Sequence, residues 1–197
     1  MSVKRFKVMP CERAEIKDFI EKWHYSKSIN GLISDYCFKL LDGDKLIGAM
    51  IYGRFAMPNV WRKYAERPEE VLELRRLCTL DDTPKNTESY FIAQTLKYLL
   101  KNTNVKTIIS YADPEYGHTG TIYKASNFEL IGRTAKGKII IYKGKKYHDK
   151  SIRTKYKGEL KPFAKELKKA LENGEAYYKK TDGKYIYKYD LEKRREG

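Results

Sequence analysis

Apolar and polar positions alternate with two different periods along this chain, and the first clear period is helical. Large apolar residues recur at i, i+3, i+4 and i+7 in the segment 11–23: Ile16, Phe19, Ile20 and Trp23. Charged residues fill most positions between them. This spacing predicts an amphipathic helix with one buried face. Asn30-Gly31 then supplies a stop and turn signal.

Strand-like patterns follow this helix. Residues 36–41 and 45–52 are short apolar runs joined by Asp42-Gly43-Asp44, which predicts a β-hairpin. Residues 54–70 lack a clear period and predict a loop that faces substrate. Residues 71–80 alternate between two faces, neither of which is wholly apolar. We therefore expect a strand there with one face lining a cleft.

The second half of the chain mixes both periods. Asn86 or Thr87 is expected to cap a helix whose apolar stripe runs from Ile92 to Leu99. A polar loop before a helix N-terminus is also how anion sites are built, because free N–H groups and the helix dipole attract negative charge. Residues 105–109 predict a buried strand, and a short helix is expected near 119–127.

The last elements lie in a Tyr- and Lys-rich region. Residues 128–133 and 138–142 flank a glycine-containing turn and are predicted to pair with each other. A helix is predicted at 162–172 and a strand at 184–189, after the turn Asp182-Gly183. This order of elements predicts an α/β (α+β) fold with a mixed, largely antiparallel central sheet flanked by helices.

Charge divides the chain unevenly. The 41 Lys and Arg exceed the 26 Asp and Glu by 15. Residues 143–197 hold 18 of these cations against 9 acidic residues, and seven of the 17 tyrosines. Cations interleaved with flat rings are typical of nucleic-acid grooves, although a solvated tail that only aids solubility has the same composition. We predict a domain at 1–144 and a basic extension at 145–197 that packs on it and contacts double-stranded DNA.

The cysteines and the N-terminus indicate the compartment. Cys11, Cys37 and Cys78 are odd in number and far apart, which favours neither a disulfide framework nor a zinc site. The N-terminal residues lack the apolar core of a signal peptide, and no run approaches the length of a membrane span. These features predict a soluble, cytoplasmic protein without a membrane partner. A homodimer is compatible with the sequence, which does not determine the oligomeric state.

Polar side chains crowd the segment 110–128, directly after the predicted strand at 105–109. They are Ser110, Tyr111, Asp113, Glu115, Tyr116, His118 and Tyr123. In α/β folds, ligands bind beyond the carboxyl ends of strands, so this segment is the first candidate for chemistry. An ordinary strand–turn–helix whose Asp and Ser satisfy turn amides is the alternative interpretation.

The segment 110–128, together with Trp23-His24-Tyr25-Ser26-Lys27-Ser28 and Glu73-Leu74-Arg75-Arg76-Leu77, resembles the Mom family. The resemblance covers roughly residues 10–155 in the same order. Members of this family are phage-encoded enzymes that hypermodify the exocyclic N6 amine of adenine in DNA and so protect the DNA from restriction. Their fold resembles the GNAT (acyl-CoA-dependent N-acyltransferase) fold.

The resemblance implies catalytic roles for His24, Tyr25, Asp113 and Tyr123. His24 and Asp113 are the expected proton acceptors, and Tyr123 is the expected donor to a leaving group. Because adenine must leave the duplex before its amine can react, an aromatic ring is expected to stack on the flipped base, and the candidates are Tyr25, Trp23, Tyr111 and Tyr116.

The implied cofactor is acetyl-CoA or a related acyl donor. Arg76, Lys85, Asn86 and Ser89 are the residues expected to hold its anionic part, or another anion. The loop before this helix, however, lacks the glycines that bind the CoA pyrophosphate in ordinary GNAT enzymes, so the donor differs or binds differently.

Two further sites are predicted from residue types alone. His24, Asp113 and His118 form a His–carboxylate–His set that suits a non-haem iron. The basic run after the domain supplies the expected DNA-phosphate contacts: Lys145, Lys146, Lys150, Arg153 and Lys155.

Two rival functions use the same residues. The first is an ordinary acyl-CoA-dependent N-acyltransferase acting on a protein, an RNA or a small amine. The second is a basic DNA-binding module without catalysis, in which substitution of His24 or Asp113 changes no reaction. The mass added to a nucleoside of host DNA separates all three.

Overall fold

The structure is a computed structural model that describes residues 2–194 of the chain. Two compact units are present. The large unit comprises the chain up to Ala112, His118–Gly132 and the chain from Tyr185 onward. The small unit comprises Asp113–Gly117 and Arg133–Lys184. The segment 145–197 that composition sets apart is therefore shared, with its first part in the small unit and its last part in the large one.

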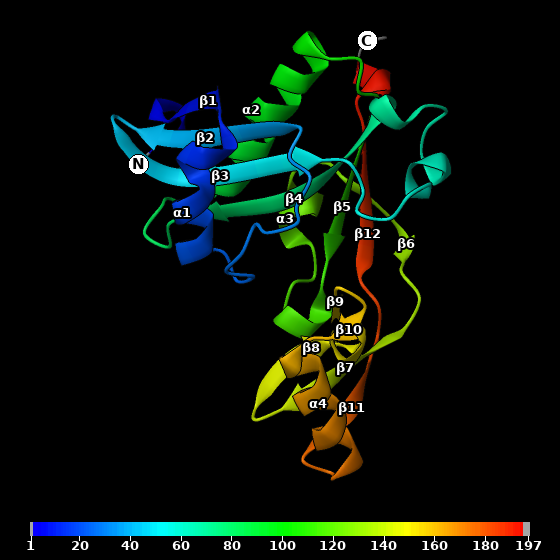
Figure 1. Cartoon of the computed structure of the whole chain (residues 1–197). Coiled ribbons are helices and arrows are strands. Elements are labelled where there is room, and N and C mark those ends of the chain that lie inside the picture. The colour runs from blue at the N-terminus through cyan, green and yellow to red at the C-terminus, as the bar shows by residue number, and fades with distance from the viewer. Residues whose placement is uncertain (1, 195–197) are drawn as a thin grey trace. The chain divides into compact units, whose positions relative to one another are not determined.

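The described part of the large unit is built on a seven-stranded sheet (Figure 1). In spatial order its strands are β1 (Lys7–Cys11), β2 (Tyr36–Asp42), β3 (Lys45–Gly53), β4 (Val71–Thr79), β5 (Thr107–Ala112), β12 (Tyr185–Asp190) and β6 (Glu129–Arg133). The pairs β1–β2, β2–β3, β3–β4 and β5–β12 are antiparallel. By contrast, β4 and β5 run parallel.

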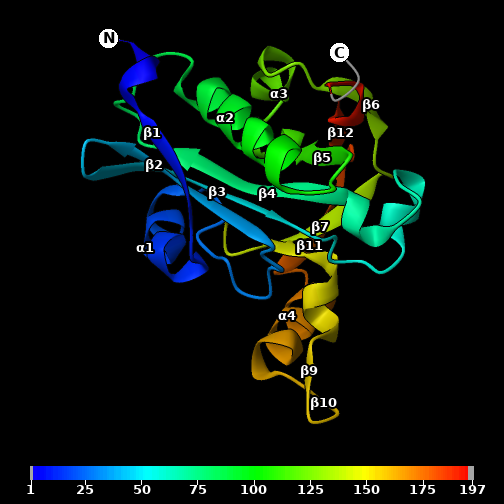
Figure 2. The same ribbon diagram turned by 90° about the horizontal axis from the view of Figure 1, so that it is seen from above.

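Helices cover both faces of this sheet, as Figure 2 shows for α1 (Arg13–Trp23) and α2 (Thr87–Asn102). The strand β3 explains why. Its residues Ala49 and Ile51 pack in one apolar cluster with Ile16 and Ile20 of α1. Their neighbours on the opposite face belong to a second cluster, together with apolar residues of α2: Met50, Tyr52, Phe91, Ile92, Leu96 and Leu99. A strand buried on both faces reads as a continuous apolar run, as the sequence of β3 does.

The parallel pair β4–β5 comes apart along its length. Pairing extends only from Val71 opposite Thr107 to Leu74 opposite Ser110. Beyond these residues β4 continues beside β3, and Figure 1 shows β4 and β5 diverging. The carboxyl ends of the two strands are thus not joined by ladder hydrogen bonds. In open sheets, ligands bind beyond the carboxyl ends of strands that separate in this way.

The small unit contains a three-stranded sheet in its described residues. Its central strand β7 (Gly137–Tyr142) pairs with β8 (Lys145–His148) and β11 (Ala176–Thr181). Helix α4 (Pro162–Glu172) packs on one face through Leu167 and Ala170, which meet Ile140, Tyr142 and Ala176. A short hairpin of β9 (Lys155–Tyr156) and β10 (Glu159–Leu160) precedes this helix.

Most predicted elements are confirmed. The predicted helices correspond to α1, α2, α4 and the short α3 (Thr121–Ala125), and the hairpin corresponds to β2–β3. The predicted mixed, largely antiparallel sheet flanked by helices is also present. No helix among residues 2–194 has both the length and the apolar character needed to cross a membrane.

One pairing prediction is wrong. The segments 128–133 and 138–142 form β6 and β7, but these strands lie in different sheets. The late strand β12 takes the place beside β6, and β7 pairs instead with β8 and β11. The strands β1, β8 and β11 were not predicted, and each lies at an edge of its sheet. An edge strand need not be apolar, so its sequence carries little strand signal.

Candidate active site

Three aromatic rings gather at the end of α1. The backbone N–H of His24 donates to the carbonyl of Ile20 at 2.9 Å and closes the helix, after which the chain turns extended. The His24 imidazole is buried and lies 4.3 Å from the Tyr25 ring. The centre of the Tyr25 ring also lies 4.9 Å from the centre of the His118 ring. The structure thus brings together three predicted site residues from segments about ninety positions apart.

The hydrogen bonds of His24 fix its tautomer. The backbone N–H of Ser26 donates to Nδ1 at 3.1 Å, and the Ser26 hydroxyl lies 2.8 Å from the same nitrogen. An imidazole nitrogen that accepts from an amide carries no proton, so in the neutral ring the proton sits on Nε2. Burial lowers the pKa of His24 to about 4, and the nearby charges of Arg76 and His118 act in the same direction. At neutral pH His24 therefore offers an N–H donor at Nε2, so its hydrogen bonds favour a donor role over the predicted role as a proton acceptor.

Arg76 holds the loop that follows His24. Its Nε and Nη2 both donate to the carbonyl of Ser28 at 3.3 Å, and its Nη1 donates to the carbonyl of Arg75 at 2.7 Å. The guanidinium is thus committed to backbone carbonyls on β4 and on the His24 loop. Its predicted role toward an anion stays a prediction, while its observed contacts make it a positioning residue.

Tyr123 marks the point where β4 and β5 diverge. The Tyr123 side chain lies near Ser110, and the buried Ser110 hydroxyl donates to the Leu74 carbonyl at 3.3 Å. Leu74 and Ser110 are the last paired residues of the two strands. Burial raises the pKa of Tyr123 to about 12, so its hydroxyl stays protonated at neutral pH. A protonated tyrosine at this position can donate to a leaving group.

Gly120 places the helix that carries Tyr123. Its φ of +79° is in the left-handed region, and a Cβ added here would lie 2.1 Å from the Tyr187 ring. Only glycine fits this approach. The Tyr187 hydroxyl donates to the Thr119 carbonyl at 2.7 Å, and its ring lies 5.3 Å from that of Tyr123. Tyr187 of β12 therefore packs against the start of α3 and helps to hold Tyr123 in place.

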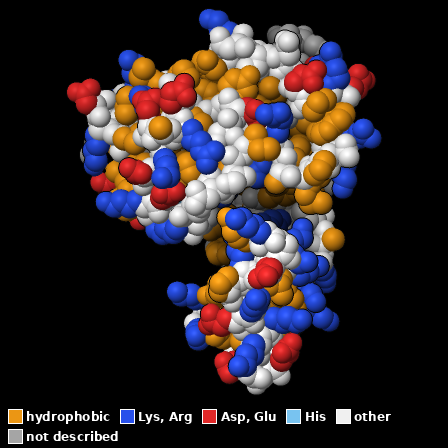
Figure 3. Space-filling view, viewed as in Figure 1, with side chains coloured by type: hydrophobic (Ala, Val, Ile, Leu, Met, Phe, Trp, Pro, Cys, Tyr) orange, Lys and Arg blue, Asp and Glu red, His pale blue; other side chains and the backbone are white. Residues whose placement is uncertain are grey.

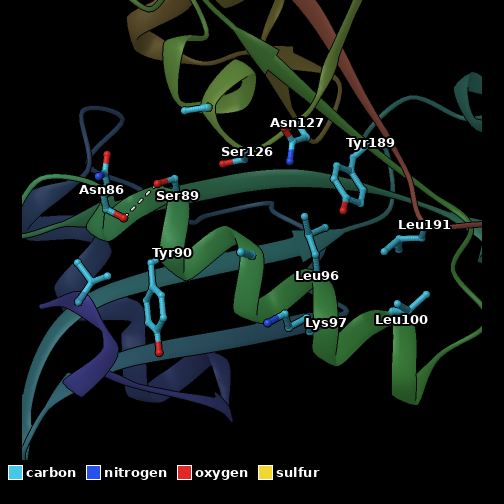
Figure 4. A pocket seen from close by; sticks show the side chains of 13 residues that line it. Asn86, Ser89, Tyr90, Leu96, Lys97, Leu100, Ser126, Asn127, Tyr189 and Leu191 are labelled. Carbon is cyan, nitrogen blue, oxygen red and sulfur yellow. Dashed lines mark hydrogen bonds between the residues drawn. The ribbon is translucent and has the colours of Figure 1, made fainter. Parts of the chain in front are cut away.

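A pocket of about 680 Å³ lies along α2 (Figure 4). Asn86 and Ser89 line its end at the N-terminus of the helix, and the Ser89 hydroxyl donates to the Asn86 carbonyl at 3.1 Å. The Ser126 hydroxyl also lines it and is buried without a hydrogen-bond partner within the described chain. The other polar side chains that line it are those of Tyr90, Lys97, Asn127 and Tyr189. Two of the four predicted cofactor-binding residues thus share this pocket, whereas Lys85 and Arg76 do not line it.

Asp113 belongs to the small unit and has structural partners there. One carboxylate oxygen accepts from the Glu115 N–H at 3.0 Å and caps the 3-10 helix Pro114–Tyr116. The other lies 3.1 Å from the Lys184 ammonium. Its role as a proton acceptor stays a prediction.

The proposed iron set receives no support from the structure. No cluster of three His, Cys, Asp or Glu side chains suited to a metal is found among residues 2–194. The unprotonated nitrogen of His24, Nδ1, also accepts a hydrogen bond from the Ser26 amide. The other nitrogen, Nε2, carries the proton in the neutral ring, so no free lone pair is left for a metal. We therefore do not assign His24, Asp113 and His118 to a metal.

The predicted DNA-contacting residues are spread over several elements of the small unit. Lys145 and Lys146 are neighbours on β8 and so point to opposite faces of its sheet. Lys150 and Arg153 lie in the 3-10 helix Asp149–Arg153, where Arg153 pairs with Asp149 at 3.0 Å. Lys155 begins β9. These residues do not form a single row, and their role in binding stays a prediction.

Sequence reasoning named two residues that support the site but did not predict their roles. Ser26 hydrogen-bonds His24, and Ser110 lies near Tyr123. Spacing did not distinguish them from turn residues, because each acts through a contact that only the folded chain creates.

Solved structures share this fold at low sequence identity. A Bacillus subtilis acetyltransferase in complex with CoA aligns over 94% of this chain and 97% of its own, with a TM-score of 0.52 and 14% identity. The enzyme NAA60 of Arabidopsis thaliana in complex with acetyl-CoA aligns over 94% and 98%, with a TM-score of 0.53 and 9% identity. The predicted GNAT-like fold is confirmed.

Sequence comparison identifies a nearer relative. The methylcarbamoylase mom of Escherichia phage Mu is 32% identical over 120 residues, which are 59% of this chain and 49% of that protein. The match thus spans about half the length of this curated relative. The description of the Mom protein family matches residues 5–196, nearly the whole sequence. The chain belongs to the Mom protein family.

Proposed function

We propose that this protein modifies the exocyclic N6 amine of adenine in DNA, by a carbamoylmethyl or acetamido-type transfer that protects phage-type DNA from restriction. The observation that carries the proposal is the 32% identity to the methylcarbamoylase of phage Mu. The arrangement of His24, Tyr25 and Tyr123 in the large unit supplies side chains that suit the reaction.

The substrate amine sets two requirements. It is conjugated with the adenine ring, so it is a weak nucleophile, and it lies inside the duplex until the base is flipped. The Tyr25 ring, 48% exposed and packed against the His24 and His118 rings, offers a surface on which a flipped base stacks. Base recognition is therefore assigned to Tyr25.

Two proton positions follow from the site. His24 keeps its Nε2–H at neutral pH and acts as a hydrogen-bond donor, either to a ring nitrogen of the base or to an oxygen of the donor group. Tyr123 keeps its hydroxyl proton and delivers it to the leaving group as the new bond to N6 forms. The amine loses one proton as the new bond forms, and the tyrosinate left at Tyr123 takes up this proton, so the product amine and the Tyr123 hydroxyl both end neutral.

The donor is proposed to be an acyl-CoA or a related compound. The two CoA-bound neighbours have the same fold, and the pocket along α2 offers Asn86, Ser89 and an unpartnered Ser126 hydroxyl to polar groups of a ligand. The N-terminus of α2 would also favour a negatively charged group on the ligand, because its N–H groups and the helix dipole attract anions. The same observations support an ordinary N-acyltransferase as the second candidate.

Nucleoside mass spectrometry tests the proposal. We expect DNA from a host that expresses the protein to contain a heavier deoxyadenosine, and a host that expresses Tyr123→Phe to contain little or none. Unmodified deoxyadenosine beside abundant folded protein would refute the proposal. Acetylated protein or polyamine in the same cells would then favour the second candidate.

A further inference from the structure

The sheet of the small unit has one face that α4 does not cover. Directly opposed residues of antiparallel strands share a face, and successive residues alternate between faces. Ile140 and Tyr142 point toward α4 and are buried there. Their neighbours on β7, and the residues paired with those neighbours, make up the opposite face, which we call the outer face: Ile139, Ile141, Lys146, His148, Tyr177 and Lys179.

Two rows of side chains cross this outer face. Lys146 and Tyr177 lie on either side of Ile141, and His148 and Lys179 lie on either side of Ile139. The isoleucines are half-buried, whereas the four flanking residues are exposed. An apolar centre flanked by cations and aromatic rings suits a ligand that has both charge and flat apolar surfaces.

A carboxylate of the same unit already sits between the two lysines. Glu115 Oε2 lies 2.9 Å from the Lys179 ammonium and 3.9 Å from the Lys146 ammonium. Lys146 also donates to the Glu115 carbonyl at 2.7 Å and lies 5.0 Å from the centre of the Tyr116 ring. The Glu115 side chain is only 17% exposed, so it is held in place. Two ammonium groups converging on one anion are the arrangement that a phosphate would also use.

The chemistry around this pair favours a polyanion. The small unit has 17 Lys and Arg against 8 Asp and Glu, so it carries +9 of the net charge of +15. Figure 3 shows Lys and Arg side chains over much of the visible surface of this unit. A groove of about 1000 Å³ borders the outer face and is lined by Glu115, Tyr116, Ile139 and Lys146, among others.

We propose that the outer face binds a single strand of nucleic acid, with phosphates at Lys146 and Lys179 and an unpaired base on Tyr177. Glu115 occupies the phosphate position in the free protein and weakens binding until a strand displaces its carboxylate. An aromatic ring on a sheet face selects unpaired bases, since a base within a duplex has no free face to stack. The choice of DNA as this polyanion rests on the proposed function.

Neighbouring tyrosines provide a matched test of the face. Tyr177 and Tyr178 are adjacent on β11, 60% and 42% exposed, and point to opposite faces. We expect Tyr177→Ala to weaken binding of a labelled single-stranded oligonucleotide about 5- to 100-fold in fluorescence anisotropy, as loss of one stacked base does. Tyr178→Ala should bind as the wild type does. Equal effects of the two substitutions would overturn the proposal.

Two glutamates provide the second test, which does not depend on how the tyrosine variants fold. Glu115→Gln and Glu166→Gln each remove one carboxylate paired with lysine, and Glu166 lies on α4, which covers the other face. We expect Glu115→Gln to tighten strand binding, because no carboxylate then has to leave Lys146 and Lys179 before a phosphate can bind, and to leave its dependence on log salt nearly unchanged, because the same phosphates are contacted. Glu166→Gln should change the affinity little. Tightening of the same size in both variants would show that net charge alone matters.

Both tests use an unmodified oligonucleotide and no donor, so they are separate from the nucleoside mass measurement. If adenine is modified but the paired variants bind the strand alike, the strand-binding role of the outer face is refuted and the proposed function stands. If the paired variants differ as predicted but no adenine is modified, the proposed function is refuted and the outer face remains a strand-binding surface. A duplex of the same sequence that binds more tightly than the single strand would also overturn the proposal.

Discussion

The two units of this protein are stabilised in different ways. The large unit packs apolar clusters on both faces of a seven-stranded sheet, and its candidate site consists mainly of neutral side chains with shifted pKa values. The small unit has one thin cluster between α4 and three strands, and it carries most of the surplus positive charge. A site of neutral, largely buried side chains suits chemistry on a base, whereas a basic surface suits attraction to phosphates. The difference suggests a division of labour between reaction and binding.

The substitution with the largest expected effect, Tyr123→Phe, should impair the modification reaction without affecting DNA binding. Tyr123→Phe removes one hydroxyl proton from the site, so we expect modification of adenine to fall by about 10²- to 10⁴-fold. DNA affinity and its salt dependence should stay at wild-type values, because a neutral hydroxyl attracts no phosphate. Single-turnover assays and anisotropy measure the two quantities. Tyr98→Phe, which alters a ring packed against Phe38 in the same unit, is the control and should remain active.

Core substitutions compare how the two units are stabilised. Phe91 is fully buried in the large cluster, so Phe91→Ala should lower the free energy of unfolding by about 3–5 kcal/mol. Leu167→Ala should cost about 2–3 kcal/mol, because its small cluster can relax around the cavity. Urea unfolding followed by circular dichroism measures both values. A larger loss for Leu167→Ala would contradict the picture of a thin core in the small unit.

Acid stability tests the neutral state of His24. Its pKa is lowered from 6.5 to about 4, so between these values the unfolded chain binds a proton that the folded chain does not. The resulting stabilisation is complete above pH 6.5 and is lost as the pH falls toward 4, which amounts to about 2 kcal/mol between pH 7 and pH 5. His24→Gln should reduce the pH dependence of unfolding by that amount. An unchanged pH dependence of unfolding in His24→Gln would contradict a neutral, buried His24.

The same contrast explains how much could be predicted from the sequence. The helices α1 and α2 and the hairpin β2–β3 were predicted because their periodicity arises from burial in the large unit. The pairing of β6 with β12 was not predicted, because β12 lies about fifty residues further along the chain. A local turn signal near Lys136 favoured β6 with β7 instead. Long-range pairing of this kind leaves no local signal.

The site was predicted in part for the same reason. His24, Tyr25 and Tyr123 were selected through the family resemblance, and all three lie in the large unit. The proton position on His24 could not be predicted, because it depends on the Ser26 amide and hence on the shape of one loop. The pairing of Glu115 with Lys146 and Lys179 was equally hidden, since these residues lie 31 and 64 positions apart.

The salt dependence of DNA binding tests the division of labour most directly. One variant replaces five cations of the small unit by glutamine: Lys145, Lys146, Lys150, Arg153 and Lys155. Its matched control replaces five exposed lysines of the large unit: Lys4, Lys7, Lys45, Lys97 and Lys101. Both variants lose the same charge, so any difference reports position.

We expect the small-unit variant to bind duplex DNA more weakly and with a salt slope flatter by up to about 4.5, or 0.9 for each lost phosphate contact. The large-unit variant should keep the wild-type slope within about one. Equal flattening in the two variants would contradict the account, because phosphate binding would then follow total charge and not the small unit.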